Sequence, residues 1–98
     1  MIPEPKVALV TGGAAGFGLA ITQQFLASSV RVVIFDLNLP QEGLFSTTDN
    51  VKVHKGDVTK REDWDQAVTL AKDTWGRIDI VVVSGFYRFS SMMTQYIP

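Results

Sequence analysis

Short apolar runs, separated by glycine-rich or polar segments, recur along the chain. The segment Lys6–Thr11 shows no alternation of apolar and polar residues, and Arg31–Phe35 has the same character. Uninterrupted apolar sequences of this kind are typical of strands in a parallel sheet that helices cover on both faces. We predict two further strands, at Val51–Lys55 and at Ile78–Val83.

Two stretches between these runs have helical spacing. From Phe17 to Ser28 the apolar positions are compatible with one helix. After Thr59 the apolar residues recur at offsets of 3, 4, 7 and 11, as on one face of a helix. These residues are Trp64, Ala67, Val68, Ala71 and Trp75. Thr59 and Glu62 have the spacing of a capping box at the start of this helix, and Gly76 is a stop signal at its end.

The alternation of strands and helices predicts an α/β protein with parallel strands and right-handed crossovers. The segment Asp36–Asn50 contains Pro40, Gly43 and several Ser and Thr residues, so we expect it to be mainly loop. The fold class is then a doubly wound parallel sheet of about four strands in the order 3-2-1-4, with two main helices on opposite faces. Ligands of such sheets bind beyond the carboxyl ends of the strands, where the chain switches sides.

Composition excludes several classes of function. A length of 98 residues leaves room for one domain, with an irregular tail expected at 86–98. The net charge of −1 argues against a nucleic-acid or anionic-membrane partner. The absence of cysteine and the single histidine exclude a disulfide framework, a thiolate zinc site and a His-rich metal site. No apolar run approaches a membrane span or a signal peptide, so we expect a cytoplasmic protein.

A glycine-rich loop between the first strand and the first helix carries the candidate chemistry. Gly12 allows a tight turn out of the strand, while Gly16 and Gly18 let the backbone approach a ligand or a strand closely. The helix that follows directs unpaired N–H groups at this loop, where a diphosphate fits. The candidate binding residues are Gly12, Ala14, Ala15, Gly16, Phe17 and Gly18. A tight turn without a ligand is the alternative.

Asp36 comes directly after the second predicted strand, 20 residues beyond Gly16. A carboxylate at this place accepts both hydroxyls of an adenosine ribose and repels a 2′-phosphate. Neither Lys nor Arg follows in the loop, which favours NAD over NADP as the cofactor. Leu37, the next residue, is a further candidate for this contact. The alternative for Asp36 is a solvated loop aspartate.

The segment Gly56–Thr59 follows the third predicted strand. Asp57 there is placed to accept a hydrogen bond from the amino group of adenine, while Val58 packs on the ring. The alternative is an Asp-containing turn that leads to a helix cap at Thr59.

Together these segments resemble the short-chain dehydrogenase/reductase family. The family's cofactor motif is TGxxxGxG, and the segment Thr11–Gly18 fits each of its fixed positions. Asp36 fits the acid of the NAD-preferring members, and Asp57–Val58 fits the pair that contacts adenine. The resemblance extends from Lys6 to about Gly85 and implies one partial NAD(P)-binding Rossmann domain at 1–98.

The resemblance weakens after the fourth predicted strand. The family has an Asn-containing motif here, but Val83 and Ser84 stand near the place of its Asn. Gly85 alone is retained, and it is the last candidate for a cofactor contact.

The catalytic Ser and Tyr-x-x-x-Lys motif of the family do not occur in these 98 residues. Tyr87 is followed four residues later by Ser91, and Tyr96 has only two residues after it. Hydride transfer to a carbonyl leaves an alkoxide, which a tyrosine protonates only if a neighbouring cation lowers its pKa. The resemblance implies oxidoreduction of an alcohol or ketone in a full-length protein, and we expect this truncated chain to be inactive alone.

Two expectations concern the chain as a whole. The alternative to an oxidoreductase segment is a non-catalytic nucleotide-binding or protein-interaction module derived from that family. The fourth strand would leave an unpaired apolar edge, so we also expect self-association.

Overall fold

The computed structural model describes residues 4–84 of the chain. Its elements are, in order, β1 (Val7–Thr11), α1 (Gly16–Ala27), β2 (Arg31–Asp36), β3 (Val51–Lys55), α2 (Arg61–Trp75) and β4 (Ile80–Val83). Within these residues the strands form one parallel sheet in the order β3-β2-β1-β4. The predicted doubly wound fold and strand order are confirmed. The predicted tail at 86–98, with Phe86, Tyr87 and Phe89, lies outside the described residues.

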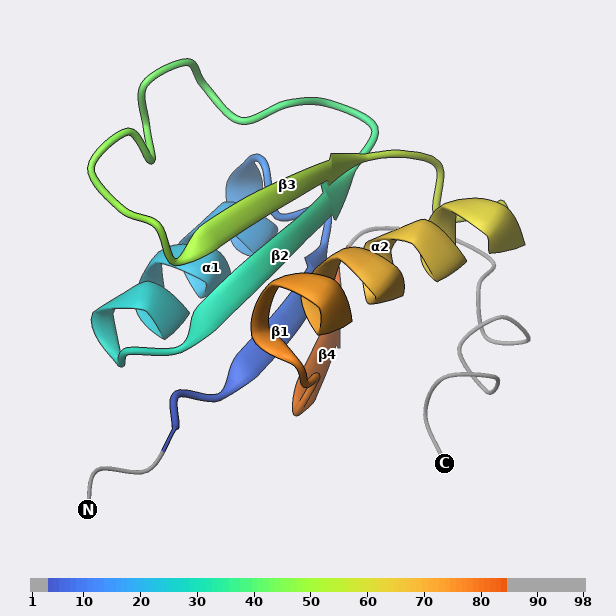
Figure 1. Ribbon diagram of the computed structural model, residues 1–98. Coiled ribbons are helices and arrows are strands. Elements are labelled where there is room, and N and C mark those ends of the chain that lie inside the picture. Colours follow the sequence, from blue (N-terminus) through green and yellow to red (C-terminus); the bar gives the residue numbers. More distant parts are fainter. Residues whose placement is uncertain (1–3, 85–98) are drawn as a thin grey trace.

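The two helices of the described part cover opposite faces of the sheet, with α2 in front and α1 behind it in Figure 1. Right-handed crossovers in opposite directions from β1 produce this arrangement. On the side of α1, Ile21, Phe25 and Leu26 pack against the buried residues Val10 and Ile34. On the side of α2, a second cluster contains Leu9, Val33, Phe35, Val58, Trp64, Ala67 and Ala71.

The strands β1 and β2 form the buried centre of the sheet. All residues of β1 are buried, as are Val32 to Phe35 of β2. The register pairs Val7 with Arg31 and Thr11 with Phe35, so both strands end at the same level. Their unbroken apolar sequence is therefore explained by burial on both faces, as predicted.

The start of α2 differs from the prediction. The N-cap is Lys60, and no side chain caps the helix there. Thr59 instead donates its hydroxyl hydrogen to Asp57 Oδ1 across an O···O distance of 2.6 Å, so the predicted capping box of Thr59 and Glu62 is wrong. The predicted end is confirmed, since α2 stops at Trp75 and Gly76 follows.

A carboxylate joins the amino ends of β1 and β4. Asp79 Oδ2 accepts a hydrogen bond from the N–H of Val7 at 2.8 Å. Arg77 donates to both oxygens of the same carboxylate, at 2.8 and 2.7 Å. The Arg77 guanidinium and the Val7 N–H hold the pKa of Asp79 below its usual value. Asp79 therefore stabilises the sheet in its ionised form.

The Asp79→Asn variant should unfold at a lower urea concentration than the parent chain at about pH 6. Because the folded pKa of Asp79 lies below the ordinary value of 3.8, its stabilising effect is complete above that value. The effect is lost as the pH falls through the folded pKa. Urea titrations at about pH 6 and about pH 3 should show the two chains converging in acid. An equal difference at both pH values would contradict this role.

The strand β4 lies at one end of the sheet in the described part of the chain. Its four residues Ile80–Val83 are half-buried. The self-association expected from this edge stays a prediction.

Neither helix found between residues 4 and 84 has the length and apolar character needed to span a bilayer.

Candidate functional site

The carboxyl ends of the parallel strands bring the predicted site residues to one edge of the sheet. Gly12 follows β1, Asp36 ends β2 and Gly56 follows β3. Ser84 follows β4, which is paired with β1 on the side opposite to β2. The chain switches sides between β1 and β4, so the edge beside Gly12 is the switch point at which such sheets bind ligands.

Close contacts leave no room for a side chain at Gly18, where the glycine loop enters α1. Gly12 has a φ of +66°, and its N–H donates to the carbonyl oxygen of Phe35 at 2.9 Å. A Cβ added to Gly18 would lie 2.0 Å from the carbonyl oxygen of Gly12. The first turn of α1 is therefore packed directly against the residue that follows β1. This is the close backbone approach that we predicted at Gly18.

The first turn of α1 offers unpaired backbone donors. Its N-cap is Ala15, which has no side-chain oxygen, and no acidic residue lies in the turn. The N–H groups of Gly16, Phe17 and Gly18 have no hydrogen-bond partner among residues 4–84. A Cβ on Gly16 would meet nothing within 4 Å, so the space beside it is open. An anion fits there, because these donors carry the positive end of the helix dipole.

Phe17 and Leu37 are apolar side chains exposed near this edge, with 86% and 47% of their surface accessible. Phe17 belongs to the first turn of α1, and Leu37 comes directly after β2. Both side chains are therefore accessible to a ligand at this edge.

Asp36 binds the glycine loop directly. Its Oδ2 accepts a hydrogen bond from the N–H of Ala14 at 3.0 Å, and its Oδ1 accepts one from the N–H of Asn38 at 3.1 Å. A carboxylate offers about four lone-pair positions, so about two remain for further donors. The carboxylate thus lies beside the loop, although 22 residues separate Asp36 from Ala14 in the sequence.

The turn after β3 places Asp57 at the same edge, but its neighbour Val58 points inward. Val58 is only 4% exposed and belongs to the core on the side of α2. Asp57 Oδ1 accepts hydrogen bonds from the N–H and hydroxyl of Thr59, at 2.8 and 2.6 Å. These bonds hold the pKa of Asp57 below its usual value and keep the carboxylate ionised. The Asp-containing turn foreseen as an alternative is present, although it leads to no cap at Thr59.

Ser84 and Thr11 connect the ends of β4 and β1. The N–H of Ser84 donates to Thr11 Oγ1 at 3.1 Å. A Cβ on Gly12 would lie 3.0 Å from the carbonyl oxygen of Ser84, so this serine stands directly against the glycine loop. Val83, the other residue near the place of the family's Asn, is half-buried in β4. Gly85, the last candidate contact, lies outside the described residues.

Sequence reasoning missed one residue that shapes the site. Asp63 Oδ2 accepts a hydrogen bond from the N–H of Asp57 at 2.6 Å. Asp63 lies in the first turn of α2, where an acid is also favourable to the helix dipole. An acid at the third helical position commonly reaches back to a free N–H before the helix, and that is the available signal.

The strand order, the glycine loop and the open start of α1 define a doubly wound α/β domain of the Rossmann type. Among solved structures, the chain is similar to the 3-ketoacyl-(acyl-carrier-protein) reductase from Brucella melitensis complexed with NADH, with a TM-score of 0.70 and 33% identity. The match covers 80% of this chain and 33% of that one. A putative 3-oxoacyl-reductase from Bacillus thuringiensis matches with a TM-score of 0.78 and 27% identity, over 89% of this chain and 38% of that one.

The family model described as short chain dehydrogenase matches residues 6–93, and the chain belongs to the short-chain dehydrogenase/reductase family. It is 36% identical over 94 residues to an uncharacterised oxidoreductase of Staphylococcus aureus strain MRSA252, a match that covers 93% of this chain. It is also 36% identical to an uncharacterised oxidoreductase of Mycobacterium bovis, over 92% of this chain and 38% of that protein. The chain spans 41% of the length of the Staphylococcus relative.

Proposed function

We propose that this chain binds NAD at the glycine loop and forms the cofactor-binding part of a short-chain oxidoreductase. The observation that carries the proposal is the hydrogen bond from the N–H of Ala14 to Asp36. This bond holds a carboxylate beside the glycine loop. The helix that follows the loop begins with unpaired N–H groups, which can bind a diphosphate. The similarity to a reductase complexed with NADH supports the same assignment.

The residues of the loop fit a dinucleotide. The diphosphate would accept hydrogen bonds from the N–H groups of Gly16 to Gly18, where no acid in the first turn of α1 opposes its charge. The space beside Gly16 is open. A methyl group at this position would obstruct the approach of the diphosphate. The N–H of Ala14 is bonded to Asp36, so we assign Ala14 to the shape of the loop rather than to the phosphate.

Asp36 accounts for the choice between NAD and NADP in this proposal. Its remaining acceptor positions receive the two ribose hydroxyls, while a 2′-phosphate there meets a negative charge. The residues from 37 to 50 include no Lys or Arg that would bind this phosphate. The proposed cofactor is therefore NAD, with NADP disfavoured.

The Asp36→Ala variant should lose the preference of the chain for NADH over NADPH. We expect NADH to bind about 10- to 100-fold more weakly, because hydrogen bonds to a charged group are lost. NADPH should be affected less, since its phosphate is no longer repelled. The measurement is a fluorescence titration of the 98-residue chain with each nucleotide.

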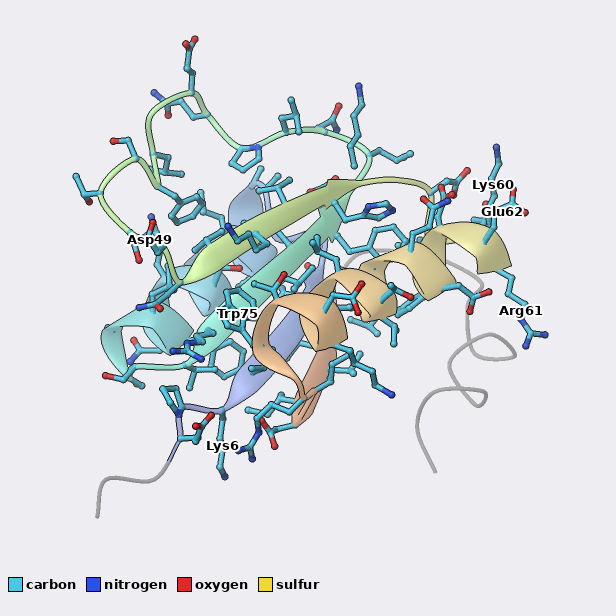
Figure 2. The ribbon with its side chains drawn as sticks, viewed as in Figure 1. Lys6, Asp49, Lys60, Arg61, Glu62 and Trp75 are labelled. Atoms are coloured by element: carbon cyan, nitrogen blue, oxygen red, sulfur yellow. The ribbon has the colours of Figure 1, made fainter. Side chains whose placement is uncertain are left out.

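The matched control for this experiment is Asp49→Ala, which removes the same charge from an exposed position on the 37–50 loop (Figure 2). It should leave both affinities unchanged. A ratio of the two affinities that is the same in Asp36→Ala and in the parent chain would refute the assignment of Asp36.

We place the adenine at the turn after β3. Asp57 Oδ2 has no hydrogen-bond partner among residues 4–84, and neither has the N–H of Val58. Because the Val58 side chain is buried, the contact we propose for Val58 is made by its backbone. Gly85 and Leu37 stay candidates for contacts with the rest of the dinucleotide.

The reaction proposed for the whole protein is hydride transfer between the nicotinamide dinucleotide and a small alcohol or ketone. The bound dinucleotide supplies the hydride carrier, while the described residues bind and orient it. No Tyr-x-x-x-Lys motif occurs in the 98 residues, so we propose that these residues alone bind the cofactor without turning over substrate. A cytoplasmic location stays a prediction.

A further inference from the structure

The turn formed by residues 56–59 connects β3 to α2 and is fixed by side chains of α2. Asp63 Oδ2 accepts the N–H of Asp57 at 2.6 Å. The indole Nε1 of Trp64 donates to the carbonyl oxygen of Val58 at 2.6 Å. Two neighbouring residues of one helix therefore hold two successive residues of the turn.

The contact of Asp63 with the turn is closely fitted. A Cβ added to Gly56 would lie 3.0 Å from Asp63 Oδ2 and 3.0 Å from Phe35 Cε1. Gly56 thus leaves the space that the carboxylate occupies. Asp63 is half-buried, whereas Lys60, Arg61 and Glu62 point outward from the start of α2 (Figure 2).

The turn carries a donor and an acceptor on two adjacent residues. The carbonyl oxygen of Asp57 accepts the N–H of Lys60 at 3.0 Å. In a trans peptide the C=O and N–H groups point in opposite directions, so the N–H of Val58 faces away from that bond. With Asp57 Oδ2, it forms a polar edge that has no partner among the described residues.

We propose that Asp63 is a positioning residue, which holds the Asp57–Val58 edge in the orientation that distinguishes adenine from hypoxanthine. The inference rests on the proposed NAD site. The amino group of adenine donates to Asp57 Oδ2, and the ring nitrogen beside it accepts the N–H of Val58. Hypoxanthine presents a carbonyl oxygen and an N–H at the same two places, so both contacts become unfavourable. The discrimination depends on the turn being held rigid, because a mobile edge can rearrange to either base.

The experiment compares NADH with its deaminated form, reduced nicotinamide hypoxanthine dinucleotide, by fluorescence titration. For Asp63→Ala we expect NADH to bind about tenfold more weakly, with the preference for NADH over the deaminated form falling about fivefold. Asp63→Asn replaces the carboxylate with an amide of the same shape, whose oxygen is a neutral acceptor. Hydrogen bonds to a neutral acceptor are about half as strong as those to a charged one. Its preference should lie between those of the parent chain and Asp63→Ala.

Glu62→Ala is the matched control, since it removes an exposed negative charge from the same turn of α2. It should leave the preference unchanged. If Asp63→Ala does not fold, as judged by circular dichroism, then the nucleotide preference of Asp63→Asn alone tests the proposal. An unchanged preference in the folded Asp63 variants, or an equal loss in Glu62→Ala, overturns the positioning role.

The failure of this inference is distinguishable from failure of the proposed function. A parent chain that binds neither nucleotide refutes the NAD site and, with it, the role of Asp63. A parent chain that binds and prefers NADH, while both Asp63 variants retain this preference, refutes only the positioning role.

Discussion

The Gly18→Ala variant is expected to lose about 3 kcal/mol or more of its free energy of unfolding and, with it, the binding of NADH. The added Cβ would lie 2.0 Å from the carbonyl oxygen and 2.5 Å from the carbonyl carbon of Gly12. Both are backbone atoms, so no change of side-chain rotamer relieves the overlap. Either α1 moves away from β1 or the glycine loop changes shape, and each outcome disturbs the proposed diphosphate site.

Gly16→Ala provides the matched control, because it adds the same methyl group two residues earlier. A Cβ on Gly16 meets nothing within 4 Å, but its φ of +59° is strained for alanine. We therefore expect a loss of only about 1 kcal/mol. Urea unfolding followed by circular dichroism measures both variants. Equal losses in the two would show that the close packing of α1 on β1 is not the cause.

Replacing Trp64 with alanine is expected to cost about 3–5 kcal/mol, a large part of the stability of a small domain. Trp64 is 1% exposed and packs edge to face on Phe35, with 5.1 Å between ring centroids. It belongs to the buried core on the side of α2. Alanine leaves a cavity there that the surrounding strands and helix fill only in part.

Trp64→Phe separates the packing of the ring from its hydrogen bond. Phenylalanine keeps an aromatic ring but leaves the carbonyl oxygen of Val58 without the indole N–H. We expect an intermediate loss of about 1–3 kcal/mol. Urea unfolding of the two variants beside Trp75→Ala, whose side chain is only half-buried, supplies the comparison. A loss in Trp75→Ala as large as in Trp64→Ala would contradict the central place given to Trp64.

The arrangement of the strands and helices was predictable from the order of residues along the chain. The unbroken apolar runs of β1 and β2 identify strands buried on both faces, and their alternation with helices leads to the observed strand order. The glycine spacing located the loop and the close approach at Gly18. These features are predictable because they depend on periodicity and on residues whose backbone freedom is intrinsic.

The hydrogen-bond partner of each polar group, in contrast, depends on how the folded chain packs. Thr59 had the spacing of a helix cap, yet its hydroxyl binds Asp57, while Asp63 takes the N–H that precedes the helix. Asp36 binds a loop amide that is 22 residues away in the sequence. Each of these hydrogen bonds has a charged acceptor and is worth about 1.5–3 kcal/mol, so competing local partners are nearly equal in energy. The packing of β1, β2 and α2 determines which partner is used, because it brings distant donors and acceptors within hydrogen-bond distance.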